Sequence, residues 1–188
     1  MSPPAGRTGY DLVATNPPWG LHYSRQERAA LSALYPDIRS GESFSYILKR
    51  GLDLLAEGGS LSFILPESVL QVKTHADIRG HILKHARIER IVRLGRVFKN
   101  VFTPVIRLDL VRGGAPACVR VMSGAGGHDV DQERFLGNSD FMFDINVNSA
   151  DGRILDRIYG EKHTTLEGKA DWALGIVTGD NGKYISDR

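Results

Sequence analysis

The chain has 188 residues, of which 41% are hydrophobic and 24% are charged, which is ordinary for a soluble globular domain with a sizeable core. Its single cysteine, Cys118, excludes an internal disulfide and a cysteine-cluster metal site, and fits a reducing compartment. We find no apolar run of membrane-spanning length and no signal-peptide core, so we expect a cytoplasmic protein that does not enter the membrane.

The first expected element is a short strand that ends in an unusual turn. Residues 10–15 contain the run Leu-Val-Ala, the pattern of a buried parallel strand. Asn16 and two prolines follow, and prolines cannot continue a central strand because they lack a backbone N–H group. The chain must therefore leave the sheet at Asn16, at the carboxyl end of the strand, where open α/β sheets bind their ligands.

The tetrapeptide from Asn16 to Trp19 has the groups needed to hold a planar exocyclic amine. The side-chain oxygen of Asn16 and the carbonyl of Pro17 are two acceptors that can converge on one amine. Hydrogen bonds accepted from the N6 amine of adenine offset the positive charge that develops as this nitrogen attacks a methyl group. Trp19 offers a flat face for a base turned out of the duplex, and such stacking contributes about 1–3 kcal/mol.

This sequence resembles the catalytic motif of the N6-adenine DNA methyltransferases, which use S-adenosylmethionine. In that family Asn-Pro-Pro-aromatic follows an Asp-Leu-Val strand, as Asn16, Pro17, Pro18 and Trp19 do here. The resemblance implies that these four residues form the catalytic motif and act on a flipped adenine of double-stranded DNA. A proline-rich turn with an incidental tryptophan is the alternative that four residues alone leave open.

Hydrophobic periodicity after the motif predicts alternating helices and strands, the pattern of an α/β fold. The expected helices are 24–34, 43–55 (stopping at Gly58-Gly59) and 74–85, and the expected strands are 60–66, 87–94 and 105–111. Weaker patterns predict a strand at 117–122, a hairpin turn at 123–127, a strand at 141–147 and a helix at 150–159. The loop 95–103 has no helix of its own, which permits the strand 105–111 to return antiparallel.

The loop 95–103 contains a second resemblance. Gly95-Arg96-Val97-Phe98 is similar to a segment of the TaqI-like branch, in which the phenylalanine stacks on the other face of the adenine. This implies that Trp19 and Phe98 hold the base between them. Phe102 is a rival for this role, and a core aromatic at a strand end is the alternative for Phe98.

Basic residues are unevenly placed, although the net charge is only +2. Between Lys73 and Arg112 there are ten Lys or Arg residues and three acidic ones. A basic segment beside a base-flipping site suits a phosphate backbone, and we expect Arg96, Lys99 and Asn100 to bind DNA. A solvated surface is an equally good interpretation of any single basic residue.

Asp77, His81 and His85 have helical spacing, which suggests a metal site at first sight. The outer two would lie about 12 Å apart along the helix axis, too far to share one ion. We therefore expect no metal and a solvated helix face.

A third resemblance lies near the end of the chain. Residues 174–185 are similar to the Gly-Ile-x-Thr-Gly-x-Asn segment that opens the target-recognition domain of related restriction-linked enzymes. We therefore expect residues 1–113 to form the C-terminal, catalytic half of a Rossmann-like methyltransferase sheet, with parallel strands and a final antiparallel hairpin strand. Residues 114–172 would connect it to a truncated recognition domain at 173–188. A cofactor loop at 123–127 is disfavoured, because no helix with an apolar stripe follows it.

The resemblance also implies that part of the enzyme is missing. Family members place the cofactor half first, and nine residues before Tyr10 cannot hold it. We expect a fragment, inactive alone, that needs a complementing N-terminal half for S-adenosylmethionine, and whose strand at Leu12 forms an apolar edge. The alternatives are a non-catalytic DNA- or protein-binding remnant, or a methyltransferase acting on RNA or on a glutamine side chain.

Overall fold

The computed structural model describes residues 8–99, 102–166 and 168–171. The chain divides into two compact units, residues 1–153 and 154–188. Of the second unit, the described part holds the C-terminal portion of one helix and a short irregular segment. The fold and the site below belong to the first unit. Within the described residues, no helix has the length and apolar character needed to cross a bilayer.

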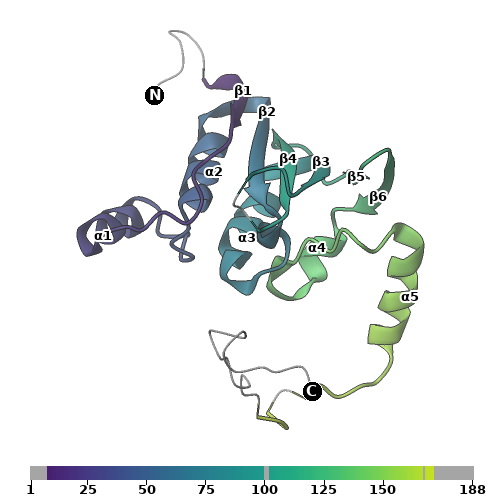
Figure 1. The fold of residues 1–188 in the computed structure, drawn as a ribbon. Coiled ribbons are helices and arrows are strands. Elements are labelled where there is room, and N and C mark those ends of the chain that lie inside the picture. Colours follow the sequence, from purple (N-terminus) through teal and green to yellow (C-terminus); the bar gives the residue numbers. More distant parts are fainter. Residues whose placement is uncertain (1–7, 100–101, 167, 172–188) are drawn as a thin grey trace, which may run out of the picture. The chain divides into compact units, whose positions relative to one another are not determined.

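Strands and helices alternate through the first half of the chain (Figure 1). The strands are β1 (Tyr10–Thr15), β2 (Leu55–Pro66), β3 (Ala86–Gly95), β4 (Val105–Arg112), β5 (Cys118–Ser123) and β6 (Gly126–Asp131). The α-helices are α1 (Arg25–Leu34), α2 (Ser43–Leu54), α3 (Ala76–His85), α4 (Arg134–Gly137) and α5 (Ser149–Gly160). Three short 3-10 turns complete the list: η1 (Glu67–Leu70), η2 (Lys73–His75) and η3 (Ser139–Phe141).

One sheet joins all six strands in the order β1-β2-β4-β3-β5-β6. β1 is parallel to β2, and β4 lies antiparallel between β2 and β3. The antiparallel return of β4 is therefore confirmed. Because β1, β2 and β3 point the same way, their carboxyl ends meet at one edge of the sheet, the edge at which Asn16 leaves β1.

The core lies between the sheet and the helices α2 and α3. On β2 the side chains of Leu61, Phe63 and Leu65 are buried, whereas those of the intervening Ser62 and Ile64 are half-exposed on the other face. The helices supply buried residues in return, namely Phe44, Leu48 and Leu52 from α2 and Ile78 and Ile82 from α3. Each such Leu, Ile or Phe contributes about 1.5–3 kcal/mol on burial.

The polypeptide after β2 is held by a fully buried arginine. Arg79 of α3 is 0% exposed, and its guanidinium donates hydrogen bonds to the carbonyls of Val69, Val72, Asp140 and Phe141 at 2.7–3.2 Å. A buried cation is tolerated where its N–H groups are satisfied, as they are here. Arg79 therefore ties the segments on either side of α3 to one another.

Two expectations were wrong in detail. The helix α2 ends at Leu54 rather than at the Gly58-Gly59 pair; Arg112 donates to carbonyls at its C-terminus, and the chain enters β2 directly. Residues 141–147 do not form a strand; the Phe143 N–H donates to the Leu70 carbonyl instead of to a sheet neighbour. β1 lies at the edge of the sheet, as expected of the strand at Leu12, and the Leu12 side chain is 63% exposed.

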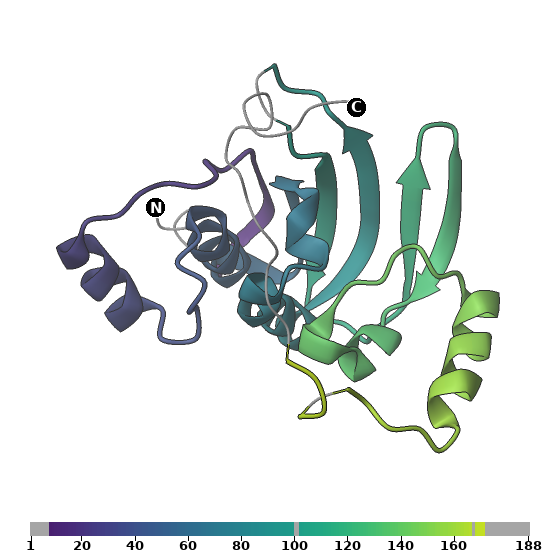
Figure 2. The same ribbon diagram turned by 60° about the horizontal axis from the view of Figure 1, so that its bottom comes forward.

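The other local expectations hold. Residues 118–131 form the β5–β6 hairpin, whose turn includes Gly124 at φ +57°, a conformation that glycine adopts without strain. Ser24 and Glu27 form a capping box at the start of α1. Because β5 pairs with β3, the hairpin extends the same sheet (Figure 2).

Candidate functional site at the carboxyl edge of the sheet

Three hydrogen bonds hold the turn after β1 in place. The Ser43 hydroxyl, at the start of α2, donates to the Pro18 carbonyl at 2.6 Å, and the Gly20 N–H donates to the Glu42 carboxylate at 3.3 Å. The indole N–H of Trp19 donates to the Ile64 carbonyl of β2 at 3.4 Å. These bonds fix the direction in which the turn leaves the sheet. Sequence reasoning missed Ser43 and Glu42, because only their position before a helix marks them.

The remaining polar groups of the turn are available to a ligand. Asn16 is exposed, and within the described part of the chain neither its side chain nor the Pro17 carbonyl has a hydrogen-bond partner. Pro17 itself is buried. A turn that holds an exposed amide oxygen next to a carbonyl without a hydrogen-bond partner is suited to bind an N–H₂ group.

Phe98 lies against Trp19. Their ring centroids are 5.8 Å apart and the ring planes meet at 74°, an edge-to-face contact. Phe98 is 38% exposed, whereas Phe102 is 84% exposed and makes no ring contact within the described residues. The structure therefore brings together the two aromatic residues that the sequence indicated for the base, and leaves the rival Phe102 apart.

The loop that carries Phe98 is anchored where it leaves and rejoins the sheet. Gly95 opens it at φ +72°, and the Pro104 carbonyl at its end accepts the Glu67 N–H at 2.8 Å. The Glu67 carboxylate pairs with Arg93 of β3 at 3.1 Å, and Arg93 also donates to the side-chain oxygen of Asn146. The carboxyl ends of β2 and β3 are thus tied to each other beneath the loop.

Most of the arginines in the basic segment are paired with acids. Five sheet arginines form ion pairs with neighbouring carboxylates, namely Arg87 with Glu89, Arg90 and Arg107 with Asp109, Arg93 with Glu67, and Arg112 with Glu57. Arg96 and Lys99 have no ion pair within the described residues, and they flank Phe98. Of the residues expected to bind DNA, these two therefore keep an unpaired charge, as do Lys73 and Lys84 elsewhere in the described part of the segment. Asn100, the third expected DNA-binding residue, lies outside the described residues.

His81 and His85 lie next to each other on α3. The Asp77 carboxylate accepts the backbone N–H groups of Arg39 and Ser40, and within the described residues no group of three metal-ligating side chains occurs. The expectation of a solvated face was wrong for His81. Its ring centroid lies 4.4 Å from that of His85, and its Nε2 atom is buried with no hydrogen-bond partner among the described residues. Burial, with the charges of Lys49 and His85, lowers the pKa of His81 to about 4.

This pKa predicts a loss of stability in acid. His81 is neutral in the folded chain but takes up a proton near pH 6.5 when unfolded, so the unfolded state binds more protons between pH 6.5 and 4. We expect the urea midpoint to fall as the pH is lowered through this range. A His81→Leu variant should show a shallower fall than wild type, with His22→Gln, a change at an exposed histidine of the loop before α1, as the control. Identical pH profiles for wild type and His81→Leu would contradict this assignment.

The comparisons with known proteins agree with this geometry. Residues 4–102, more than half of the chain, match the family model described as Eco57I restriction-modification methylase. The chain belongs to the Eco57I restriction-modification methylase family. The family region includes the turn from Asn16 to Trp19 and also Phe98.

Relatives of this Eco57I-family chain are longer than it is. It is 27% identical over 180 residues to the type II methyltransferase M.VspI of Vibrio sp. (strain 343), a match that spans 93% of this chain and 43% of the relative. Among solved structures, it resembles a class I S-adenosylmethionine-dependent methyltransferase of Listeria monocytogenes (TM-score 0.52, 20% identity, 80% of this chain and 42% of that one). A modification subunit of a type I restriction enzyme from Vibrio vulnificus YJ016 is similar (TM-score 0.52, 16% identity, 82% and 32%). The sheet is thus a portion of a Rossmann-like methyltransferase fold, as expected.

Proposed function

We propose that this chain carries the catalytic edge of an S-adenosylmethionine-dependent DNA methyltransferase that modifies N6 of an adenine flipped out of the duplex. The observation that carries the proposal is the meeting of the pinned Asn16–Trp19 turn with Phe98 at the carboxyl edge of the sheet. Two open acceptors and two aromatic rings there match the hydrogen-bonding and stacking needs of adenine.

The acceptors would act on the amine in the transition state. The adenine N6 lone pair is conjugated into the ring, so this nitrogen is a weak nucleophile. Hydrogen bonds to the Asn16 oxygen and the Pro17 carbonyl favour a tetrahedral nitrogen and stabilise the positive charge that develops on it. No general base is needed, because the proton can leave to water after the transfer.

The two aromatic rings would have to separate to admit a base. A base stacked on both faces needs parallel rings about 7 Å apart, twice the ~3.4 Å stacking distance. Trp19 and Phe98 are closer than this and nearly perpendicular. Because Trp19 is hydrogen-bonded to β2, Phe98 would be the ring that moves to admit the base.

The described residues do not form a complete site for S-adenosylmethionine. Within them, no parallel strand runs into a glycine-rich loop that opens a helix and is followed by an acidic residue for the ribose. We therefore assign the cofactor, which supplies the methyl group, to a complementing half, and we expect the isolated chain to be inactive. The share of M.VspI that this chain leaves uncovered, and the edge position of β1, support this assignment.

The edge position of β1 predicts self-association of the isolated chain. An apolar strand at a sheet edge is a template for pairing with another strand. We expect Leu12→Lys to shift sedimentation-velocity profiles towards monomer, and Leu34→Lys, which changes another exposed leucine, on α1, to leave them unchanged. A wild-type chain that stays monomeric and does not bind its complementing half would rule out this part of the proposal.

Cofactor binding by the isolated chain tests whether the cofactor site belongs to the complementing half. We expect calorimetry with S-adenosylmethionine to show no binding to the chain alone. Binding to the chain alone would show that the cofactor site has been assigned to the wrong half. If the chain neither binds cofactor nor supports transfer when its complementing half is added, the non-catalytic remnant is the better interpretation.

A further inference from the structure

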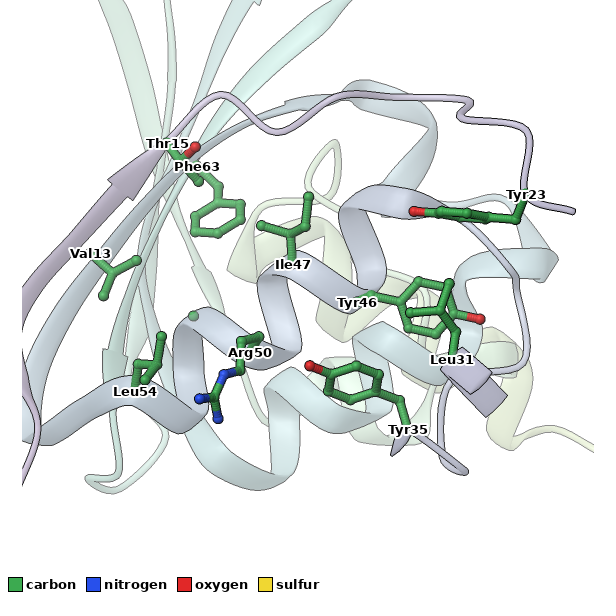
Figure 3. Close-up of a pocket in the computed structure, with 11 residues that line it drawn as sticks. Val13, Thr15, Tyr23, Leu31, Tyr35, Tyr46, Ile47, Arg50, Leu54 and Phe63 are labelled. Carbon is green, nitrogen blue, oxygen red and sulfur yellow. The ribbon is translucent and has the colours of Figure 1, made fainter. Parts of the chain in front are cut away.

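A groove lies beneath β1, on the face of the sheet that α2 covers (Figure 3). Its volume is about 320 Å³, and Val13 of β1, Phe63 of β2 and Ile47 and Leu54 of α2 give it an apolar floor. The groove is separate from the contact between Trp19 and Phe98, neither of which lines it. No step of the proposed reaction uses it.

The far wall of the groove is aromatic and comes from α1 and its flanking segments. Tyr23 and Tyr35 lie 6.2 and 5.6 Å from Tyr46 of α2, measured between ring centroids, and Leu31 of α1 packs beside them. α1 has no buried residue of its own. Tyrosines place an apolar ring against the groove and a hydroxyl at its rim, which suits a surface that is covered by a partner.

The connection rule for α/β sheets indicates what covers this groove. The crossover from β1 through α2 to β2 fixes one face of the sheet, and parallel crossovers are right-handed in nearly all proteins. A parallel strand placed outside β1 and leading through a helix into β1 would run in the same direction across the sheet, and would therefore place that helix on the same face as α2. The groove between β1, α1 and α2 is the space that such a helix would fill.

Arg50 specifies the chemistry of that helix. It lines the groove, is exposed, and has no ion pair within the described residues, whereas Lys49 beside it is paired with Asp53 at 3.8 Å. A helix laid over the groove would remove the Arg50 guanidinium from water. Such a cation needs a carboxylate partner, because burying it unpaired is costly.

We infer that the groove binds an amphipathic helix of the complementing half, with an apolar stripe on the floor and an Asp or Glu facing Arg50. This inference rests on the proposed need for a complementing half and adds its docking site. The helix would approach with its stripe at i, i+3, i+4 and i+7 spacing. The charge of Arg50 would set its register.

The test is a selection that uses a defined probe. Helices of about 15 residues with a fixed leucine stripe are displayed on phage, and the positions bordering the stripe are varied among Asp, Glu, Lys and Arg. We expect binders of the wild-type chain to carry an acid at one border position, with about tenfold weaker binding when that acid is replaced by lysine. When the Arg50→Glu chain is the selection target, the binders should carry Lys or Arg at that position.

A matched control and a second measurement make the result decisive. Lys84→Glu also replaces a positive charge with a negative one, but at an exposed lysine of α3 outside the groove. This variant should select the same helices as wild type. If the Arg50→Glu chain selects helices with the same acidic residue as wild type does, or if no helix binds either chain, the inference is overturned. If Arg50→Glu instead abolishes self-association of the chain in sedimentation velocity, the groove is occupied by a second copy and the inference is also overturned. Neither readout involves methyl transfer, so a failure of the proposed reaction remains distinguishable.

Discussion

Replacing Asn16 with alanine is expected to lower kcat for methyl transfer to DNA by about 10²–10³-fold, with DNA affinity changed by no more than about twofold. The side-chain oxygen of Asn16 is one of two acceptors assigned to the adenine amine, and its contribution is greatest when positive charge develops there. Asn16 is exposed and has no hydrogen-bond partner within the described residues, so the fold has no need of it. Single-turnover transfer from radiolabelled cofactor, with the chain assembled on its complementing half, measures the effect.

A conservative variant separates this chemistry from a structural role. Asn16→Asp keeps an oxygen acceptor at the same position and should lose much less activity than Asn16→Ala. Thermal unfolding should be unchanged in both variants. Equal losses in the two variants, or a loss of DNA affinity rather than of kcat, would show that Asn16 does not act on the amine.

Phe98→Ala is expected to weaken binding of DNA that contains the target adenine by about 1–3 kcal/mol, the contribution of one base–aromatic stack. Phe98 is the aromatic residue in contact with Trp19, which places its ring beside the proposed position of the base. With 2-aminopurine at the target position, fluorescence should report a base that is turned out but less well stacked. Phe98→Tyr keeps the ring and should restore binding.

Phe102→Ala is the matched control for this effect. Phe102 lies in the same loop region, is 84% exposed and has no aromatic neighbour among the described residues. Its replacement should leave the affinity and the fluorescence near the wild-type values. The opposite pattern, with Phe102→Ala weakening binding and Phe98→Ala neutral, would transfer the stacking role to Phe102.

The local elements could largely be predicted because their signals are local. The capping box at Ser24, the apolar stripe of α2 and the alternating residues of β4 each specify their element within about ten residues. The strand expected at 141–147 failed because its backbone groups bond to segments distant in sequence, such as the Leu70 carbonyl. Sequence periodicity carries no information about such partners.

In the site, too, features made by adjacent residues could be predicted, whereas contacts between distant residues could not. The Asn16–Trp19 turn was recognisable because prolines, an amide and an aromatic are adjacent in the chain. The pairing of Arg90 with Asp109 was not predictable, because these two residues meet only through the register of β3 and β4. Counting charges along the sequence therefore overstated the basic surface, because it does not show which arginines are paired with acids.

The nature of the methylated product tests the central claim most directly. The chain, assembled with its complementing half, is incubated with isotopically labelled S-adenosylmethionine and a mixture of double-stranded DNA, RNA and protein, and each fraction is digested and analysed by mass spectrometry. The account predicts that the label appears in N6-methyladenine from DNA and is lost with Asn16→Ala. Label in cytosine, in RNA or in a glutamine side chain, with unmethylated DNA adenine, would contradict it.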